Sequence, residues 1–433
     1  MSANQNFQKG GASRLTLDVL GQLFDSKALQ NVSFRLWDGT MWPDDAPRTT
    51  TIVLNHPGAL RHIFRDTHTD LSFGEAYIYD DFNIDGDIYA VFQLAEDLLL
   101  QKWDLVKRVN LGLKLLQLPG ERKIAEDVRQ AARVKGRRHS LERDRQAIAY
   151  HYDVSSDFYP LFLDKNLIYS CAYFERGDED LETAQERKLD YLCRKLRLQP
   201  GERLLDIGCG WGGLVIYAAQ QYGVKAMGIT LSQPQAELAT EKIQQASLGN
   251  LCSVEMCDYR ELDENQQFDK LVSVGMFEHV GQALLPVYFQ KAWNLLKPGG
   301  VFLNHGIAQN IQVPYQDSNF NDRYVFPDGE LVAINLTLRE AEKAGFEIRD
   351  VESLREHYAQ TLRQWVCRLE MNHETALHYV DEATYRVWRL FMSGSAHGFE
   401  TGRLNLYQTL LVKAFEQPSG LPRTRADWYA ASI

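Results

Sequence analysis

A glycine-rich stretch, Leu204–Gly213 (LLDIGCGWGG), is the clearest place where this chain could bind a ligand. It begins as an apolar strand, passes through a turn rich in glycine and opens a helix. Glycine has no side chain, so such a turn can approach a ligand closely and adopt torsion angles closed to other residues. The spacing is G-x-G-x-G-G, whereas a dinucleotide pyrophosphate favours G-x-G-x-x-G. The structural alternative is a tight turn without a ligand.

Two polar residues further along could do acid–base chemistry. Glu278 follows the apolar segment 269–274, and His305 ends the apolar segment 300–305. A buried carboxylate is rarely left unpaired, and ligands of α/β proteins bind at the carboxyl edge of the sheet. The alternatives are a paired core carboxylate and a satisfied core histidine. His279 is adjacent to Glu278, should point elsewhere and is interpreted as structural.

Alternating strands and helices must position these residues. From about residue 150 onward this alternation predicts an α/β fold, a Rossmann-like domain with a mostly parallel, doubly wound sheet. The expected strands are 203–207, 225–229, 251–256, 269–274, 300–305, 346–351 and 404–415. The expected helices are 213–222, 233–246, 284–296, 338–344 and 361–393.

The preceding part of the chain divides into two further regions. The pattern of residues 1–100 predicts a small α+β N-terminal domain that could face lipid. Its expected strands are 32–37 and 51–54, and its expected helices are 60–64 and 87–100. Residues 101–148 predict a basic helical linker, and residues 149–433 the catalytic domain.

The linker is basic. Residues 102–148 hold 13 Lys and Arg against 6 Asp and Glu. Such a segment either attracts anionic lipid headgroups or is a solvated linker. Its apolar residues favour a membrane surface, but Gly112 and Pro119 argue against one long amphipathic helix.

Composition restricts the function classes. The 433 residues carry a net charge of −11, which argues against bulk nucleic-acid binding, and no apolar run has the length of a spanning helix. The six cysteines form no C-x-x-C pair, so no metal site is expected, and a reduced cytoplasmic setting fits. A membrane substrate would then be reached from the surface, at the inner face of the membrane.

Several motifs together resemble one enzyme family. Asp206-x-Gly-x-Gly is similar to the first motif of S-adenosylmethionine (SAM) methyltransferases. The wider set resembles cyclopropane fatty acid synthases and the related mycolic acid methyltransferases. The matching segments are His151–Asp153, Ile168–Phe174 (IYSCAYF), Asp206–Gly213, Gly228–Ser232, Ser273–Gly281 (SVGMFEHVG) and Tyr324–Gly329. Phospholipid-modifying members also carry a preceding domain, which favours that branch.

The resemblance implies two sets of site residues. It implies SAM contacts by Tyr169, Ser170, Asp206, Gly208, Gly210, Gly212, Thr230, Leu231, Gln235, Asp258 and Tyr259. Asp258 would bind the adenine amino group and Tyr259 would cover the ring. The second expected strand ends without the carboxylate that commonly holds the ribose, which is a departure from the general methyltransferase pattern.

The second set follows from the chemistry that the resemblance implies. Methyl transfer to an isolated alkene leaves a carbocation, and loss of a proton from the new methyl closes a cyclopropane ring. The base in family members resembles a bound bicarbonate. Its expected holders are Glu278, His305, Tyr358 and the backbone N–H groups of Cys171 and Ile307. Tyr152 and Tyr169 would place π faces near the cation.

The expected function is therefore cyclopropane-fatty-acyl-phospholipid synthase, a peripheral membrane enzyme acting on unsaturated phospholipid acyl chains. Three alternatives remain. The same scaffold could give a methyl-branched or hydroxylated chain, the acceptor could be a small N or O nucleophile, or the protein could bind lipid without catalysis. A homodimer is compatible with the sequence.

Overall fold

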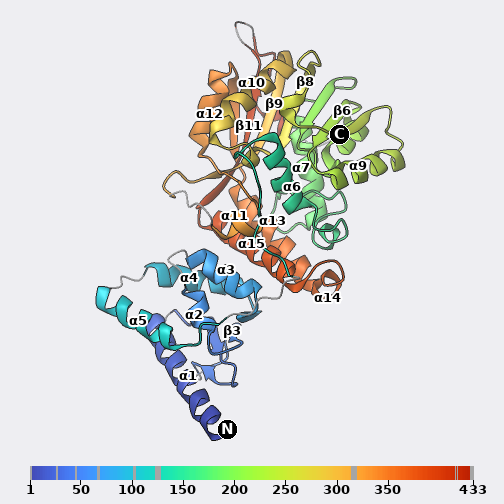
Figure 1. The fold of residues 1–433 in the computed structure, drawn as a ribbon. Helices are drawn as coiled ribbons and strands as arrows, with labels where there is room; N and C mark the ends of the chain where they lie inside the picture. The colour runs from blue at the N-terminus through green and yellow to red at the C-terminus, as the bar shows by residue number, and fades with distance from the viewer. Residues whose placement is uncertain are drawn as a thin grey trace. The chain divides into compact units, whose positions relative to one another are not determined.

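The computed structural model of the chain describes residues 2–25, 28–43, 46–65, 69–100, 104–121, 128–313, 319–414, 416 and 418–429. The described residues form two compact units. One contains residues 1–131, 317–324 and 381–397, and the other contains residues 132–316, 325–380 and 398–433. Figure 1 shows both as ribbons. Among the described residues, no helix is both long enough and apolar enough to cross a membrane.

The larger unit is built on a sheet of seven strands among the described residues, in the order β10-β11-β9-β8-β5-β6-β7. The strands from β9 to β7 are parallel, and β11 runs antiparallel to both β9 and β10. The bounds are β5 Arg203–Ile207, β6 Lys225–Thr230, β7 Cys252–Met256, β8 Phe268–Val274, β9 Leu296–Gln309, β10 Glu347–Ser353 and β11 Leu404–Val412. The expected mostly parallel α/β fold is confirmed.

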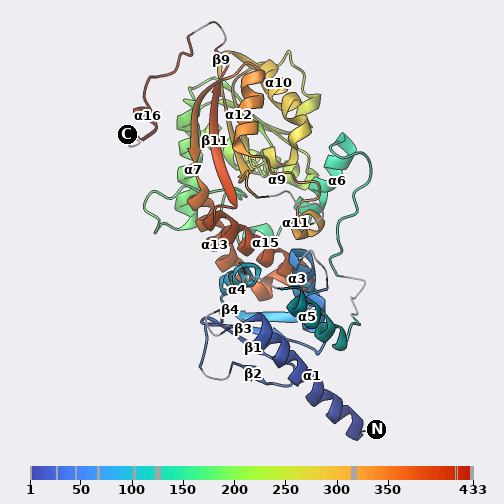
Figure 2. The same cartoon turned by 90° about the vertical axis from the view of Figure 1, so that its left-hand side faces the viewer.

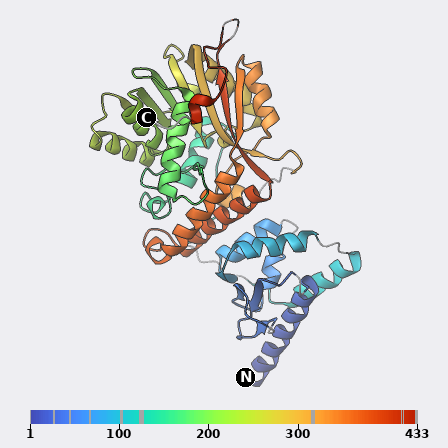
Figure 3. The ribbon, with the colours of Figure 1, turned by 180° about the vertical axis from the view of Figure 1, so that it is seen from behind.

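Helices cover both faces of this sheet. Apolar side chains of α7 (Leu181–Leu196), α8 (Gly213–Tyr222) and α9 (Gln233–Gln245) pack in one buried cluster with the sheet. Those of α10 (Leu285–Leu295) and α12 (Ile334–Lys343) pack in another. Figure 2 shows α7 on one side of β11 and α10 and α12 on the other, and Figure 3 shows the ribbon of Figure 1 from behind.

The strand order reverses beside β5. The chain runs from β5 outward to β6 and β7, and then returns to place β8 on the other side of β5. The loops after β5 and β8 therefore diverge at the same edge of the sheet, which is where doubly wound folds bind ligands. The glycine-rich turn follows β5 and Glu278 follows β8, so the topology brings the two candidate sites to one edge.

The larger unit has further helical elements outside the sheet. They are α6 Leu141–Tyr152, η1 Tyr159–Leu161, η2 Tyr259–Glu261, η3 Phe277–His279, η4 Gln282–Leu284, α13 Arg355–Met371, α14 His373–Ala376 and α16 Ala426–Tyr429. The segment 361–393, expected to be helical, is covered by α13, α14 and α15 (Glu382–Glu400), with breaks between them. Residue 415, the end of the last expected strand, lies outside the described residues.

The N-terminal unit is an α+β fold with a sheet of four strands among its described residues, in the order β2-β1-β3-β4. The strands are β1 Val32–Arg35, β2 Met41–Trp42, β3 Thr50–Leu54 and β4 Phe82–Gly86. Its helices are α1 Ser2–Leu23, α2 Ala59–Ile63, α3 Thr69–Ile78, α4 Tyr89–Leu100, α5 Leu105–Gln117 and α11 Phe320–Tyr324, with most of α15. Arg389 of α15 donates to the hydroxyl of Tyr77 at 2.7 Å, which fixes that late segment to the unit.

Helix α5 presents two different apolar faces. Leu115 is buried, whereas Leu105, Val109 and Leu116 are 76%, 52% and 63% exposed. Asp104 caps its N-terminus, since its side chain accepts the N–H of Lys107. The helix ends at Gln117, two residues before Pro119, as expected for a residue that cannot continue a helix. The apolar part of the basic region is thus one short helix.

Candidate active site

A pocket opens at the carboxyl end of the parallel strands. It is lined by the turn after β5, the ends of β6 and β8, and residues of α6, α7 and η2. The lining includes ten residues expected to contact SAM: Tyr169, Ser170, Asp206, Gly208, Gly210, Thr230, Leu231, Gln235, Asp258 and Tyr259. Tyr152 also lines it, and so does His279, which the sequence analysis interpreted as structural. Residues from distant parts of the chain therefore share one cavity.

The three glycines of the turn have different surroundings. Gly208 and Gly210 have φ values of +87° and +54°, which residues with a side chain rarely adopt. A Cβ at Gly208 would lie 2.6 Å from Met276, whereas one at Gly210 would meet no atom within 4 Å. Gly212 does not line the pocket, and its Cβ would lie 3.0 Å from Ala239 of α9. Gly212 therefore allows close packing of helices, and Gly210 leaves space in the pocket.

The polar residues after β6 are hydrogen-bonded to one another. The hydroxyl of Thr230 donates to Gln235 Oε1 at 2.7 Å, and the Ser232 hydroxyl caps α9. After β7, the carboxylate of Asp258 accepts from the guanidinium of Arg260, with Nε at 2.8 Å. Arg260 also donates to Asp144 of α6 at 2.8 Å. These contacts hold the wall of the pocket in place.

A buried lysine, which the sequence analysis did not identify, lies at the same pocket. Lys188 of α7 lines it, and its Nζ donates to the Ser170 hydroxyl at 2.9 Å. Among the described residues no carboxylate lies within ion-pair distance of this Nζ. Burial lowers the pKa of Lys188 to about 8, with Asp164 and Asp206 acting in the opposite direction.

Asp206, at the end of β5, is the second buried charge of the pocket. Burial raises the pKa of Asp206 to about 7, although Lys188 opposes the shift. Its Oδ1 is buried without a hydrogen-bond partner in the described part of the chain. An ammonium group beside Asp206 and a carboxylate beside Lys188 would each be stabilised, so the pocket suits a zwitterionic amino-acid group.

Glu278 is buried behind the turn that follows β8. Its Oε1 accepts the backbone N–H of Ile307 at 2.6 Å, which places these two predicted residues together. Its Oε2 has no partner among the described residues. Burial raises the pKa of Glu278 to about 7, and the Ile307 N–H opposes the shift. Glu278 can therefore exchange a proton near neutral pH.

His305 of β9 is held in one tautomer by a chain of hydrogen bonds. The Lys195 ammonium donates to Gln408 Oε1 at 2.8 Å, so the Gln408 amide nitrogen faces His305 Nδ1, at 3.1 Å. Nδ1 accepts, and the ring proton sits on Nε2, which has no partner within the described residues. Burial, together with the charges of Lys188 and Lys195, lowers the pKa of His305 well below its usual value. The ring is a neutral donor.

Aromatic rings surround these groups. Tyr358 of α13 packs edge-on against Trp365, with ring centroids 6.1 Å apart, and Trp365 lies 5.1 Å from Tyr169. Tyr169 in turn meets Tyr152 edge-on at 6.2 Å. Burial raises the pKa of the Tyr358 hydroxyl well above its usual value, and the charge of Glu278 adds to this. The wall is apolar, neutral and rich in π faces.

Cys171 is fully buried and chemically quiet. Its thiol contacts the carbonyl oxygens of Ala172 at 3.1 Å and Leu354 at 3.8 Å. Burial raises the pKa of the Cys171 thiol well above its usual value. A thiol in this state is a poor nucleophile, so any contribution of Cys171 comes through its backbone.

Comparison with known proteins places this geometry in a family. The family model described as "Mycolic acid cyclopropane synthetase" matches residues 139–409. The chain is 40% identical over 401 residues to the "Probable fatty acid methyltransferase" of Pseudomonas putida, covering 91% of this chain and 95% of that protein. It is 37% identical over 267 residues to the "Cyclopropane-fatty-acyl-phospholipid synthase" of Escherichia coli (strain K12), covering 61% of this chain and 67% of that protein.

A solved structure supports the cofactor pocket. The mycolic acid cyclopropane synthase CmaA1, complexed with SAH and CTAB, aligns with a TM-score of 0.59 and 34% identity over 62% of this chain and 98% of that one. Two relatives that span nearly the whole chain are each named a probable fatty acid methyltransferase, not a phospholipid synthase. A preceding domain therefore does not by itself favour the phospholipid branch, contrary to the sequence analysis.

Proposed function

Because the chain belongs to the mycolic acid cyclopropane synthetase family of SAM-dependent methyltransferases, we propose that it is a cyclopropane synthase for unsaturated phospholipid acyl chains. The observation that carries this proposal is the buried group of Glu278, His305 and Tyr358 beside an apolar, aromatic wall. Such a site accepts a lipid chain and holds the proton-transfer groups that ring closure requires.

The proposed reaction balances as follows. The alkene π electrons form a bond to the SAM methyl carbon, and the carbon–sulfur bond breaks to release S-adenosylhomocysteine. The adjacent chain carbon becomes a cation, which the faces of Tyr152 and Tyr169 stabilise. A C–H bond of the new methyl then breaks, its electrons close the ring, and the proton passes to a base.

The residues around Glu278 fit a bound bicarbonate in this role. His305 Nε2 offers a proton without a described partner, and the Glu278 carboxyl, with a pKa of about 7, is protonated in part of the molecules. Both can donate to an anion. The Ile307 N–H already donates to Glu278, so it positions that carboxyl and is not directed at an ion as expected. When bound, bicarbonate supplies an oxygen base for the methyl proton.

A second candidate function is fatty acid C-methylation without ring closure. It is favoured by the near-full-length similarity to a probable fatty acid methyltransferase. Here the cation loses a proton from a neighbouring chain carbon, so the product keeps a double bond and carries a methyl branch. Placement of the base relative to the new methyl decides between the two outcomes.

One experiment separates the two products. The protein is incubated with SAM and vesicles of cis-monounsaturated phospholipid, and the acyl chains are studied by mass spectrometry and proton NMR. Both outcomes add one CH₂ by mass. Cyclopropane ring protons without vinyl protons support the proposal. Persisting vinyl protons support the second candidate, and an unchanged lipid contradicts both.

Lys188 is proposed to hold the carboxylate of the SAM methionine moiety together with Ser170. Changing Lys188 to Met should weaken S-adenosylhomocysteine binding by about 10–100-fold, the range expected for one charged hydrogen bond. Calorimetry with 5′-methylthioadenosine, which lacks the amino-acid group, provides the control and should show unchanged affinity. An equal loss for both ligands would indicate damage to the whole pocket and remove the assignment.

Membrane contact is proposed to involve α5. Its exposed face combines Leu105, Val109 and Leu116 with nearby Lys107 and Arg108. Such a surface inserts shallowly between headgroups and attracts anionic lipid. In the larger unit, Arg133, Lys135 and Arg137 are exposed, whereas Arg138 lies 3.9 Å from Asp328. The part of the basic segment around Arg138 therefore contacts its own unit.

Vesicle sedimentation tests the two contributions separately. Changing Val109, Leu113 and Leu116 to Ser should reduce binding to anionic vesicles at low and high salt. Changing Arg133, Lys135 and Arg137 to Gln should reduce it only at low salt, because salt shortens the screening length from about 10 Å at 0.1 M to about 3 Å at 1 M.

The control is Met371→Ser, which removes an exposed apolar side chain outside both segments. It should leave vesicle binding unchanged. Turnover on detergent-dispersed lipid should survive in all three variants. Unchanged vesicle binding by both triple variants would favour the solvated-linker interpretation.

A further inference from the structure

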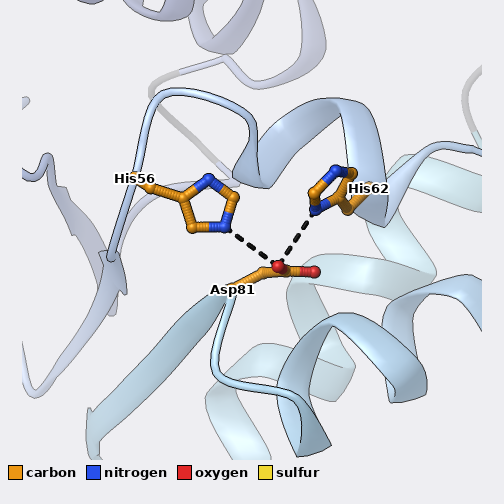
Figure 4. Close-up of side chains that lie close together, drawn as sticks. All are labelled: His56, His62 and Asp81. Carbon is orange, nitrogen blue, oxygen red and sulfur yellow. Dashed lines mark hydrogen bonds and ion pairs between the residues drawn. The ribbon is translucent and has the colours of Figure 1, made fainter. Parts of the chain in front are cut away.

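A cluster of three side chains in the N-terminal unit is separate from the proposed reaction. His56 lies in the loop after β3, His62 in α2, and Asp81 directly before β4. Figure 4 shows both imidazole rings turned toward the same carboxylate. The spacing of these residues matches no common metal motif, and the sequence analysis expected no metal site.

The three potential ligand atoms converge closely. His56 Nε2 lies 2.9 Å and His62 Nδ1 lies 3.0 Å from Asp81 Oδ1. Each residue offers a ligand atom within 4.8 Å of the others. Zinc–ligand bonds of about 2.0–2.1 Å in a tetrahedron place neighbouring ligands about 3.3 Å apart, so small side-chain rotations would admit the ion.

Burial preorganises this cluster. His62 and Asp81 are buried, and His56 is partly exposed, with 35% of its side chain accessible. The Gly58 N–H donates to His56 Nδ1 at 3.1 Å, so the ring proton of His56 lies on Nε2, which faces Asp81. Neither ring nitrogen of His62 has a hydrogen-bond partner of acceptable geometry in the described residues. The buried His62 imidazole thus faces a carboxylate without forming a hydrogen bond to it. A cation bound between the two would supply the missing interaction.

We propose that His56, His62 and Asp81 bind a divalent transition-metal ion, with Zn²⁺ as the best match. Two imidazoles and one carboxylate suit zinc and its neighbours, whereas Mg²⁺ and Ca²⁺ favour all-oxygen sets. Three protein ligands leave a fourth position, which the exposed side of His56 opens to solvent. The ion would tie the end of β3, α2 and the start of β4 together.

The competing arrangement is a proton-bridged His–Asp–His cluster. The Gly58 bond to His56 Nδ1 places the ring proton on Nε2, where it can donate to Asp81. For zinc to bind His56 Nε2, the ring proton must move from Nε2 to Nδ1, and the Gly58 N–H must then give up its hydrogen bond to Nδ1. The two arrangements therefore differ in one observable, the uptake of metal.

The test uses the full chain with any affinity tag removed and the protein stripped with chelator. Zinc chloride is added in competition with a chromogenic chelator, and bound zinc is measured after dialysis. We expect about one zinc per chain, with a tetrahedral visible spectrum when Co²⁺ replaces it. Asp81→Asn and His62→Gln should weaken binding by more than the roughly 10–100-fold that loss of an outer-shell partner costs.

Two further variants keep the test decisive. His56→Gln changes the partly exposed ligand and should lose zinc even if the buried substitutions disturb folding. His378→Gln changes an exposed histidine of the other unit and should bind zinc like the parent chain. Zinc should also raise the Tm of the parent and of His378→Gln only. Absence of zinc uptake by the parent, or equal uptake by all variants, would overturn the metal site.

Discussion

Changing Glu278 to Gln is expected to lower turnover about 10²–10⁴-fold, the usual loss when a positioned acid–base group is removed. The amide keeps the size of the carboxyl and can still accept the Ile307 N–H. It cannot exchange a proton near neutral pH, which the carboxyl does because burial raises its pKa to about 7. Glu278 does not line the SAM pocket, so the affinity for S-adenosylhomocysteine should stay the same.

Steady-state turnover on unsaturated phospholipid and calorimetry with S-adenosylhomocysteine check both parts. Glu342→Gln, which changes an exposed carboxylate on α12, is the control and should behave like the parent chain. If Glu278→Gln turns over at a near-normal rate, the carboxyl has no part in proton transfer. If cofactor affinity falls as well, the residue supports the fold and not the chemistry.

Changing Gly210 to Val is expected to abolish SAM binding. Gly210 has a φ of +54°, which a β-branched residue strongly disfavours. A Cβ at this position would meet no protein atom within 4 Å, so the valine would project into the pocket space that the cofactor needs. The backbone strain at this φ and the loss of pocket space both weaken cofactor binding. Calorimetry with S-adenosylhomocysteine measures the loss of affinity.

Gly299→Val provides the matched control for this prediction. Gly299 also has a positive φ, +74°, and does not line the pocket, and a Cβ at this position would also meet no atom within 4 Å. Its variant should bind S-adenosylhomocysteine normally. A folded Gly210→Val protein with unchanged affinity would show that the turn does not contact the cofactor.

Local signals in the sequence were sufficient for the sheet and the glycine turn. The strand 203–207 and the helix 213–222 were predicted with the bounds that β5 and α8 have, because an apolar run, a glycine turn and a helical period follow one another. The residues expected at the cofactor followed from the family resemblance, and most of them lie on loops that directly follow such strands. The roles of these residues stay predictions.

Residues supplied by distant elements could not be found in this way. Lys188 lies on a helix with several charged neighbours, where a lysine normally indicates a solvated face. Gln408 lies on β11, whose antiparallel pairing with β9 places it opposite His305. Gly112 and Pro119 argued only against one long amphipathic helix, and α5 includes Gly112 but ends at Gln117. A Cβ at Gly112 would meet nothing within 4 Å, so this glycine performs no packing role.

The buried carboxyls of Asp206 and Glu278 have a consequence for the stability of the whole domain. Both have a folded-state pKa of about 7, above their ordinary values of 3.8 and 4.5. At a pH between the ordinary value and about 7, each carboxyl is charged in the unfolded chain and mostly neutral in the folded one. At these two sites the folded state therefore holds more protons, so their contribution to stability falls as pH rises through this range, by at most about 1.4 kcal/mol per pH unit for each group. Above about pH 7 the loss levels off.

Denaturation curves of the ligand-free protein between pH 5 and 8 should record this slope, and Glu278→Gln should reduce it. The two carboxyls best placed for chemistry thus make the fold less stable toward neutral pH.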